Sequence, residues 1–184
     1  MLNKKWIIFI LLGLLALGVS ACNKSTTQTP PATPAPAPVQ QAVAQDVILY
    51  FADNQAEYLV PEKRSVQVDK ADDVQKLAEA VVKELIVGPK DSHLFRTLPA
   101  ESRLLSVKID KNVVIVDFSK ELQSKHSGGS TGEIMTVYSL VNSLAELPGI
   151  NTVQLLIEGQ KVDSLVGHVD TSEALTRDAT LLKK

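Results

Sequence analysis

The chain has 184 residues, with 19 lysines and arginines against 21 aspartates and glutamates, and a single cysteine. A nucleic-acid-binding protein needs a basic surface for phosphate contacts, so the slightly acidic balance argues against that class. One cysteine excludes a disulfide within the chain.

The first 21 residues have the pattern of an export signal. Lys4 and Lys5 precede the apolar stretch WIIFILLGLLALGV, which ends at Val19. A membrane-spanning helix needs about 20 apolar residues, whereas a charged start followed by roughly 7 to 15 apolar residues is typical of a cleaved secretory signal. We therefore predict that residues 1–21 are removed on export.

The signal ends in a motif that predicts lipid attachment. Residues 19–22 read VSAC and resemble the lipobox of bacterial lipoproteins, in which an apolar residue and two small ones precede a cysteine. The resemblance implies a thioether-linked diacylglycerol on Cys22, cleavage before it, and acylation with a fatty acid such as palmitate. Two or three acyl chains hold a protein stably at a bilayer. We expect a lipid-anchored protein on the extracytoplasmic face of the cell membrane; the alternative is a secreted protein with a chance cysteine.

Residues 22–45 carry the lipidated Cys22 and then a proline-rich stretch. Residues 23–45 hold five of the nine prolines and no large apolar residue beyond two valines. Such a segment cannot bury a core and favours extended polyproline II. The prediction is a disordered tether between the membrane and a single domain at 46–184.

The first half of that domain predicts two strands, a helix and a hairpin. Residues 47–51, VILYF, are typical of a buried strand, and the following YLVPEKRSVQV extends the pairing, with Pro61 confined to an edge or an interruption. Residues 72–87 place apolar residues at helical spacing, and Gly88-Pro89 ends the helix. Residues 104–119 predict a hairpin that turns at 110–112, with the second strand central.

The second half predicts another helix and another strand. Apolar residues recur at helical spacing from Ile134 to Ala145, before Pro148-Gly149, and TVQLLIEGQKV follows as a strand with a turn at Gly159. The expected class is α+β, with a mixed sheet and two amphipathic helices on one of its faces.

The loop HSGGSTG raises the question of a serine nucleophile. GGSTG fits Gly-x-Ser-x-Gly, and Ser130, Asp163 and His168 follow in the order of α/β-hydrolases. In such enzymes a strand runs directly into the serine, whereas here the preceding strand ends near Ser119. Ser130-Thr131-Gly132-Glu133 also fits a capping box, in which Ser130 and Glu133 bond each other's backbone N–H. We expect a helix cap and no catalytic residue.

Three segments together carry a family resemblance. LPAESRLLSVKIDKNVVIVDFS, GGSTGEIMTVYSLVNSLAELPGINTVQLLIEGQ and GHVDTSEALTRD resemble the GerMN domain of sporulation and spore germination, over about residues 46–178. The resemblance implies a lipid-anchored extracytoplasmic domain of the ring-building type, used in cell-envelope assemblies and without a known catalytic site.

The remaining polar residues do not form a recognisable metal or cofactor motif. His93, His126 and His168 are dispersed without metal-ligand spacing, and we expect neither metal nor cofactor. The expected function is a protein-binding or assembly module of the envelope, with a protein partner and with homo-oligomers left open. The alternatives are a small hydrolase that uses Ser130, Asp163 and His168, and a peptidoglycan- or small-ligand-binding module whose binding residues the sequence does not assign.

Overall fold

The computed structural model describes residues 42–183; the predicted signal, Cys22 and nearly all of the predicted tether lie outside them. The chain begins with a two-stranded antiparallel sheet, the β1–β2 hairpin, made of β1 (Val43–Ala52) and β2 (Leu59–Val68). Val43 lies opposite Val68 and Ala52 opposite Leu59. Both predicted strands are present, and regular structure starts before Asp46.

A second, mixed sheet is formed by the remaining strands in the order β3-β4-β5-β6. The β4–β5 pair is parallel and the other two pairs are antiparallel. β4 is therefore central, as the sequence predicts for the second strand of the hairpin. The bounds are β3 (Leu104–Asp110), β4 (Val113–Phe118), β5 (Thr152–Ile157) and β6 (Leu175–Thr176).

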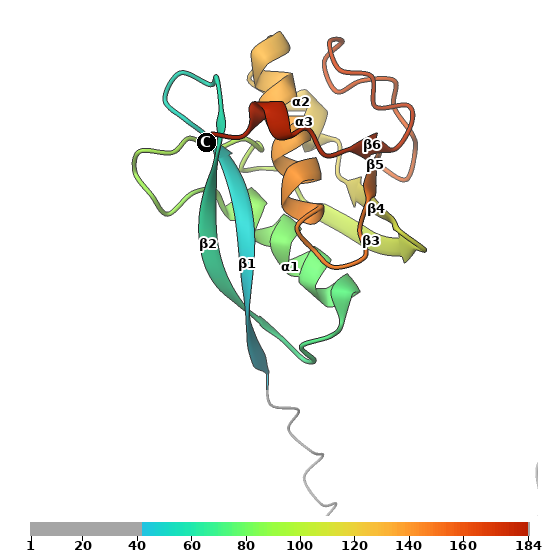
Figure 1. Cartoon of the computed structure of the whole chain (residues 1–184). Coiled ribbons are helices and arrows are strands. Elements are labelled where there is room, and N and C mark those ends of the chain that lie inside the picture. Colours follow the sequence, from blue (N-terminus) through green and yellow to red (C-terminus); the bar gives the residue numbers. More distant parts are fainter. Residues whose placement is uncertain (1–41, 184) are drawn as a thin grey trace, which may run out of the picture. The chain divides into compact units, whose positions relative to one another are not determined.

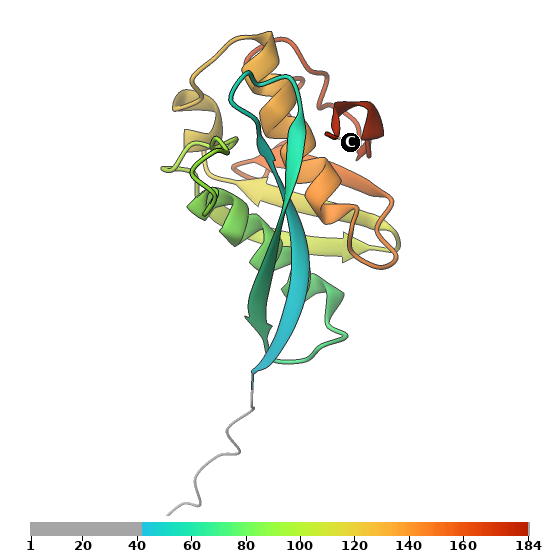
Figure 2. The ribbon, with the colours of Figure 1, turned by 60° about the vertical axis from the view of Figure 1, so that its left-hand side comes forward.

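Two long helices, α1 (Val74–Val87) and α3 (Ser130–Leu144), lie between the mixed sheet and the β1–β2 hairpin (Figures 1 and 2). α1 contacts β3 and both hairpin strands, and α3 contacts β1, β5 and β6. The short helix α2 (Glu121–Ser124) precedes α3, and a 3-10 turn, η1 (Ala179–Leu181), lies near the end of the chain. The expected α+β class, with both helices on one face of a mixed sheet, is confirmed; the first two strands form a layer of their own.

One hydrophobic core joins the three layers. Phe51 from the hairpin, Val81 from α1, Leu140 from α3 and Val116 from the mixed sheet are all buried in it. A second, smaller cluster, which includes Tyr50, Leu59 and Met135, packs on the other face of the hairpin. Both faces of β1 are therefore covered, which agrees with the continuous apolar run in its sequence.

α1 ends where the sequence predicts, at Val87 before Gly88, and begins at Val74, two residues after the predicted start. The Asp73 side chain accepts the N–H of Lys76 at 3.0 Å and caps the start. Gly88 follows the last helical residue with φ of 92°, a left-handed conformation that favours glycine, and its N–H bonds the carbonyls of Glu84 and Leu85.

Pro61 lies inside β2 without breaking the ladder. Its partner across the sheet is Tyr50. The Tyr50 backbone turns away from β2, because its N–H donates to Ser143 Oγ at 3.0 Å and its carbonyl accepts from Ser139 Oγ at 2.5 Å. The missing N–H of proline therefore costs no ladder bond, as expected for an edge strand.

Within residues 42–183, no helix is long and apolar enough to cross a membrane.

Candidate functional site

The three residues of the hydrolase alternative do not form a catalytic constellation. Ser130 is exposed at the start of α3, and no hydrogen bond links it to His168 or Asp163 in the described residues. His168 Nδ1 lies 3.1 Å from Glu133 Oε2, and Asp163 is exposed. A nucleophile requires a base within hydrogen-bond reach, so the geometry gives Ser130 no activating partner.

The predicted capping box is also wrong. The N-cap of α3 is Gly129, and Ser130 is the first helical residue, with no side-chain bond to the helix start. Glu133 is buried, and its carboxylate accepts the backbone N–H groups of Leu165, Val166 and His168 at 2.8, 2.9 and 2.7 Å. Three convergent donors in a buried position stabilise a carboxylate more than one N–H at an exposed helix start.

Glu133 is therefore an anchor for the long loop between β5 and β6. Burial by itself would raise the pKa of the Glu133 carboxyl. The three backbone N–H groups and His168 together lower this pKa by more than burial raises it, so it lies below its usual value. Gln123 Nε2 holds the same loop through the carbonyls of Ser164 and Leu165. This cluster stabilises the fold and leaves no open position for a ligand.

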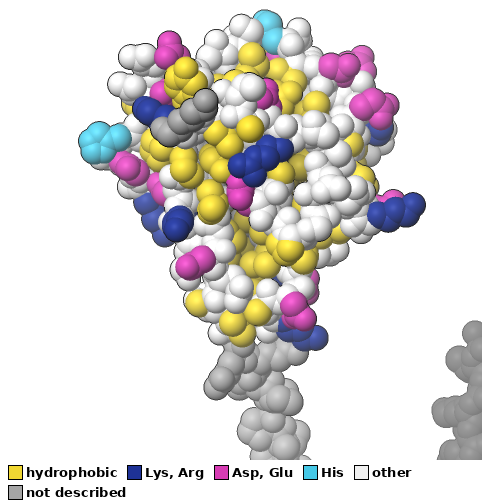
Figure 3. Space-filling model, viewed as in Figure 1, with side chains coloured by type: hydrophobic (Ala, Val, Ile, Leu, Met, Phe, Trp, Pro, Cys, Tyr) yellow, Lys and Arg dark blue, Asp and Glu magenta, His cyan; other side chains and the backbone are white. Residues whose placement is uncertain are grey.

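A different part of the molecule carries the features of a binding surface. Three hollows lie around the turn of the β1–β2 hairpin. This turn is at the opposite end of β1 from Val43 (Figure 1). We call this region the tip surface and define it as residues 53–58, 91–99, 125–127 and 180–183. The cavity volumes of the three hollows are about 300, 380 and 570 Å³. Figure 3 shows apolar side chains gathered on the visible part of this end.

Two aromatic side chains are exposed on the tip surface. Phe95 is 52% exposed and lines both the 300 Å³ and the 570 Å³ hollow. Tyr58 is 42% exposed and lines the 380 Å³ hollow. Large aromatic residues are usually buried, and exposed ones that rim concave surface are typical of binding sites.

The hairpin turn and Phe95 are held in place by backbone contacts. Phe95 exchanges two hydrogen bonds with Ala52, at 2.8 and 3.2 Å, and so extends the outer edge of β1. The Asp53 carboxylate accepts the N–H groups of Gln55, Glu57 and Tyr58 at 3.3, 3.0 and 3.4 Å. Burial raises the Asp53 pKa, but these donors and Lys183 bring it below its usual value.

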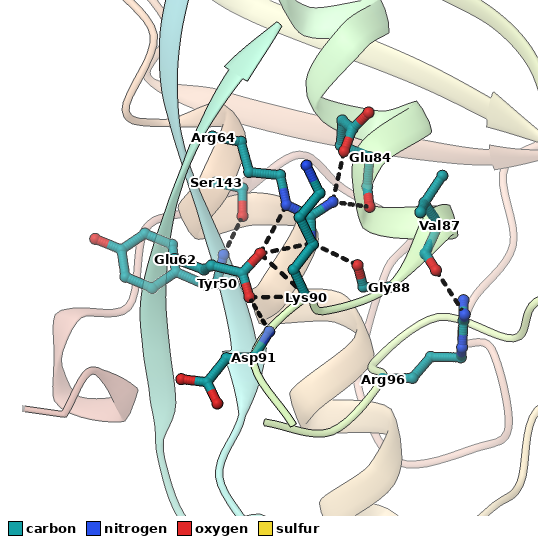
Figure 4. Close-up of polar contacts among 10 residues, drawn as sticks. All are labelled: Tyr50, Glu62, Arg64, Glu84, Val87, Gly88, Lys90, Asp91, Arg96 and Ser143. Carbon is teal, nitrogen blue, oxygen red and sulfur yellow. Dashed lines mark hydrogen bonds and ion pairs between the residues drawn. The ribbon is translucent and has the colours of Figure 1, made fainter. Parts of the chain in front are cut away.

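A buried arginine network positions the loop that carries Phe95 (Figure 4). The Arg64 side chain is 1% exposed and bonds Glu62 Oε1 at 2.7 Å, Glu84 Oε2 at 2.5 Å and the Gly88 carbonyl at 2.5 Å. Glu62 also accepts the N–H groups of Lys90 and Asp91, each at 3.0 Å. β2 and the end of α1 are thereby tied to the start of the 91–99 loop.

A second arginine holds the same loop from the other side. The Arg96 guanidinium donates to the carbonyls of Ile86 and Val87 in the last turn of α1. The bond to Val87, at 2.6 Å, is drawn in Figure 4. Positive charge and donors at a helix C-terminus are stabilising. A Cβ on Gly88 would lie 2.7 Å from Arg96 Nη2, so a side chain at position 88 would displace this guanidinium, and the φ of 92° also favours glycine there.

Buried hydroxyl groups of α3 fix the far end of the loop. Thr136 Oγ1 donates to the Thr97 carbonyl at 2.5 Å, and Thr97 Oγ1 lies 2.7 Å from Ser139 Oγ. His126 Nε2 lies 2.9 Å from Thr136 Oγ1, while His126 Nδ1 accepts the Gly128 N–H at 3.0 Å. This network assigns the proton of a neutral ring to Nε2. Burial lowers the pKa of His126 despite the Glu133 charge.

The described residues therefore define a class: an α+β domain that presents a preformed, concave surface with exposed aromatic residues. No group of three His, Cys, Asp or Glu within residues 42–183 could hold a metal ion. The sequence pattern of the Germane family, described as "Sporulation and spore germination", matches residues 48–163. The chain belongs to this family, and the GerMN resemblance is confirmed.

Solved structures with the same fold agree with this assignment. A presumed lipoprotein from Clostridium perfringens is 28% identical, over 72% of this chain and 87% of that one, with a TM-score of 0.54. The first GerMN domain of the sporulation protein GerM from Bacillus subtilis is 23% identical, over 73% of this chain and 98% of that one, with a TM-score of 0.56.

The tandem GerMN domains of the same Bacillus subtilis protein are 22% identical, with a TM-score of 0.57. The match covers 83% of this chain and 51% of the tandem protein, so the chain spans about half the length of that relative. No curated protein matches the chain.

Sequence reasoning missed the tip surface, Arg64 and Glu62. The polar residues of α3 left a signal, because Thr136, Ser139 and Ser143 recur at helical spacing inside an apolar helix. Hydroxyl groups at such spacing indicate a buried polar face that needs partners. The sequence around Arg64 does not indicate that this residue is buried, because Arg64 stands among polar residues in a strand.

Proposed function

We propose that the protein is a lipid-anchored, extracytoplasmic module that binds another protein of the cell envelope through its tip surface. The observation that carries the proposal is Phe95, which is half exposed on a loop fixed by the Arg64 network, the Arg96 contacts and the bridge to Ala52. Exposure of an apolar ring adds no folding stability, so its rigid display supports a binding role.

The attachment point of the chain supports the same role. The segment that leads to Cys22 joins the domain next to Val43, at the end of β1 away from the tip surface. A lipid anchor on Cys22 would leave the tip surface free of its own attachment point. The similarity to a presumed lipoprotein supports the anchor, and the family description supports a role in sporulation or germination.

Site-specific photo-crosslinking in intact cells tests the proposal. A photoreactive amino acid placed at position 95 of the full chain should give adducts with an envelope protein. Leu105 on β3 is the matched control, because it is 47% exposed and lies outside the tip surface. Adducts from position 95 that are absent from position 105 support the proposal.

Equal adducts from positions 95 and 105 would overturn the proposed function. A lack of adducts from position 95 and also from position 58 would overturn it as well.

The peptidoglycan alternative has its own readout, because the hollow beside Phe95 is large enough for a sugar. The full chain would then co-sediment with purified cell wall, and this binding would be lost in Phe95→Ala and retained in Leu105→Ala. Such a result would indicate that the tip surface binds a glycan and not a protein.

A further inference from the structure

The 300 Å³ hollow of the tip surface has an apolar floor and a positive rim. Ala52, Ala56 and Met135 belong to one hydrophobic cluster and line the hollow together with Phe95. Its volume is at the lower end of the range for ligand pockets and suits one large side chain.

The charges that face this hollow do not cancel. Lys125 lines the hollow and has no ion-pair partner among residues 42–183, whereas the Arg96 guanidinium is held by the carbonyls of Ile86 and Val87 at the end of α1. Asp53 is the acidic residue of the lining, but its carboxylate is occupied by three backbone N–H groups and faces Lys183 at 3.8 Å. The hollow therefore presents the positive charge of Lys125 beside apolar surface.

Hydrogen bonds within the domain hold the wall of the hollow in place. His126 bonds Thr136 on one side and Gly128 on the other, and Thr136 bonds the Thr97 carbonyl. Residues fixed in this way lose little conformational freedom when a ligand binds, which favours affinity.

We infer that this hollow receives one apolar side chain of an acidic segment of the partner protein. The apolar group would contact Met135 and Phe95, and a flanking carboxylate would face Lys125. The inference rests on the proposed function and specifies the chemistry of the segment that is bound. Charge complementarity of this kind selects partners more than it adds affinity.

Met135 offers a direct reporter for the test. The chain has two methionines, Met1 and Met135, and Met135 lines the hollow. In the full chain purified in a nonionic detergent and labelled with ¹³C at the methionine methyl groups, the Met135 signal should shift saturably with acetyl-Asp-Glu-Leu-Asp-Glu-amide. The basic counterpart, acetyl-Lys-Lys-Leu-Lys-Lys-amide, should leave it unchanged.

Matched variants locate the effect. Lys125→Glu should weaken binding of the acidic peptide about fivefold or more, whereas Lys108→Glu, an exposed reversal on β3 outside the lining, should not change it. Gly132→Leu should abolish the shift by filling the hollow from α3; a Cβ there meets His126 at an ordinary 3.5 Å. The surface variant at position 125 keeps the test decisive if position 132 does not accept leucine.

Several outcomes would overturn the inference. Equal shifts with both peptides would remove the charge argument, and shifts with hexanoate but with neither peptide would indicate a small-molecule pocket. No shift with any of the three probes would show that the hollow does not bind such groups. If position 95 gives adducts and the peptide experiment gives any of these results, this inference is rejected and the proposed function is retained. A lack of adducts from positions 95 and 58 rejects the proposed function itself.

Discussion

Glu133 and His168 are joined by two contacts of one carboxylate oxygen: Glu133 Oε2 accepts the His168 backbone N–H at 2.7 Å and lies 3.1 Å from His168 Nδ1. These contacts fasten the β5–β6 loop to the first turn of α3. They take the Glu133 carboxylate away from the helix start and explain why Ser130 has no capping partner.

Glu133→Gln should destabilise the domain by about 2–3 kcal/mol, because an amide cannot accept all four contacts and its NH₂ group would face backbone donors. Ser130→Ala should change the free energy of unfolding by less than about 0.5 kcal/mol, because its exposed hydroxyl makes no cap. Denaturant unfolding of both variants tests the assignment. A cost at Ser130 that matches a lost cap, about 1 kcal/mol, would restore the capping box.

Acid should destabilise the protein partly through Glu133. The folded pKa of this group is below its unfolded value, so the carboxylate contributes stability above about pH 4.5, and the contribution is lost as pH falls through the folded pKa. Unfolding followed from about pH 6 to 3 should show a smaller loss in Glu133→Gln than in the wild type. Asp53, Glu62 and Asp91 also have lowered pKa values, so a reduced slope is expected and not a flat line.

His126 should give a separate pH dependence at milder acidity. Its pKa is lowered in the folded state, so stability is complete above the unfolded value of about 6.5 and falls as pH drops through the folded pKa. His126→Gln should remove the part of the slope that begins as pH falls below about 6.5, while His93→Gln, at a side chain that is 91% exposed, should retain it. An identical slope in both variants would contradict the assignment of His126 as a partly buried neutral ring.

Arg64→Met should cost about 3–5 kcal/mol, because it leaves Glu62 and the end of α1 without their buried partner. Arg64→Lys should not rescue stability, since an ammonium cannot reach all three acceptors in the geometry of a guanidinium. Arg103→Met is the control: Arg103 pairs with Glu121 but is 66% exposed, so a loss below about 1 kcal/mol is expected. Similar losses at positions 64 and 103 would show that the buried network does not hold the loop.

Cys22→Ser should move the protein from the membrane fraction to the soluble or secreted fraction, because Cys22 is the single cysteine and the predicted acylation site. Cell fractionation with immunodetection measures the change. Retention of a cleaved variant in the membrane would reject lipid anchoring.

The sequence by itself determined most of the secondary structure. The apolar run at 47–51, the helical spacing within 72–87 and the alternation of 104–119 are local patterns, and the elements formed where those patterns predict them. Asp73 and Gly88 also act locally, because a helix end is stabilised by its own neighbours in the chain.

The tertiary structure decided the partners of the buried polar groups. S-x-x-E at 130–133 is a valid cap pattern, yet Glu133 bonds the β5–β6 loop at Leu165, more than thirty residues later in the chain. Arg64 meets Glu84 and Gly88 only because β2 packs against the end of α1, and that packing displays Phe95. A buried charge is stabilised by whichever donors or acceptors the fold brings within about 3 Å, and no local pattern specifies contacts between residues so distant in the chain.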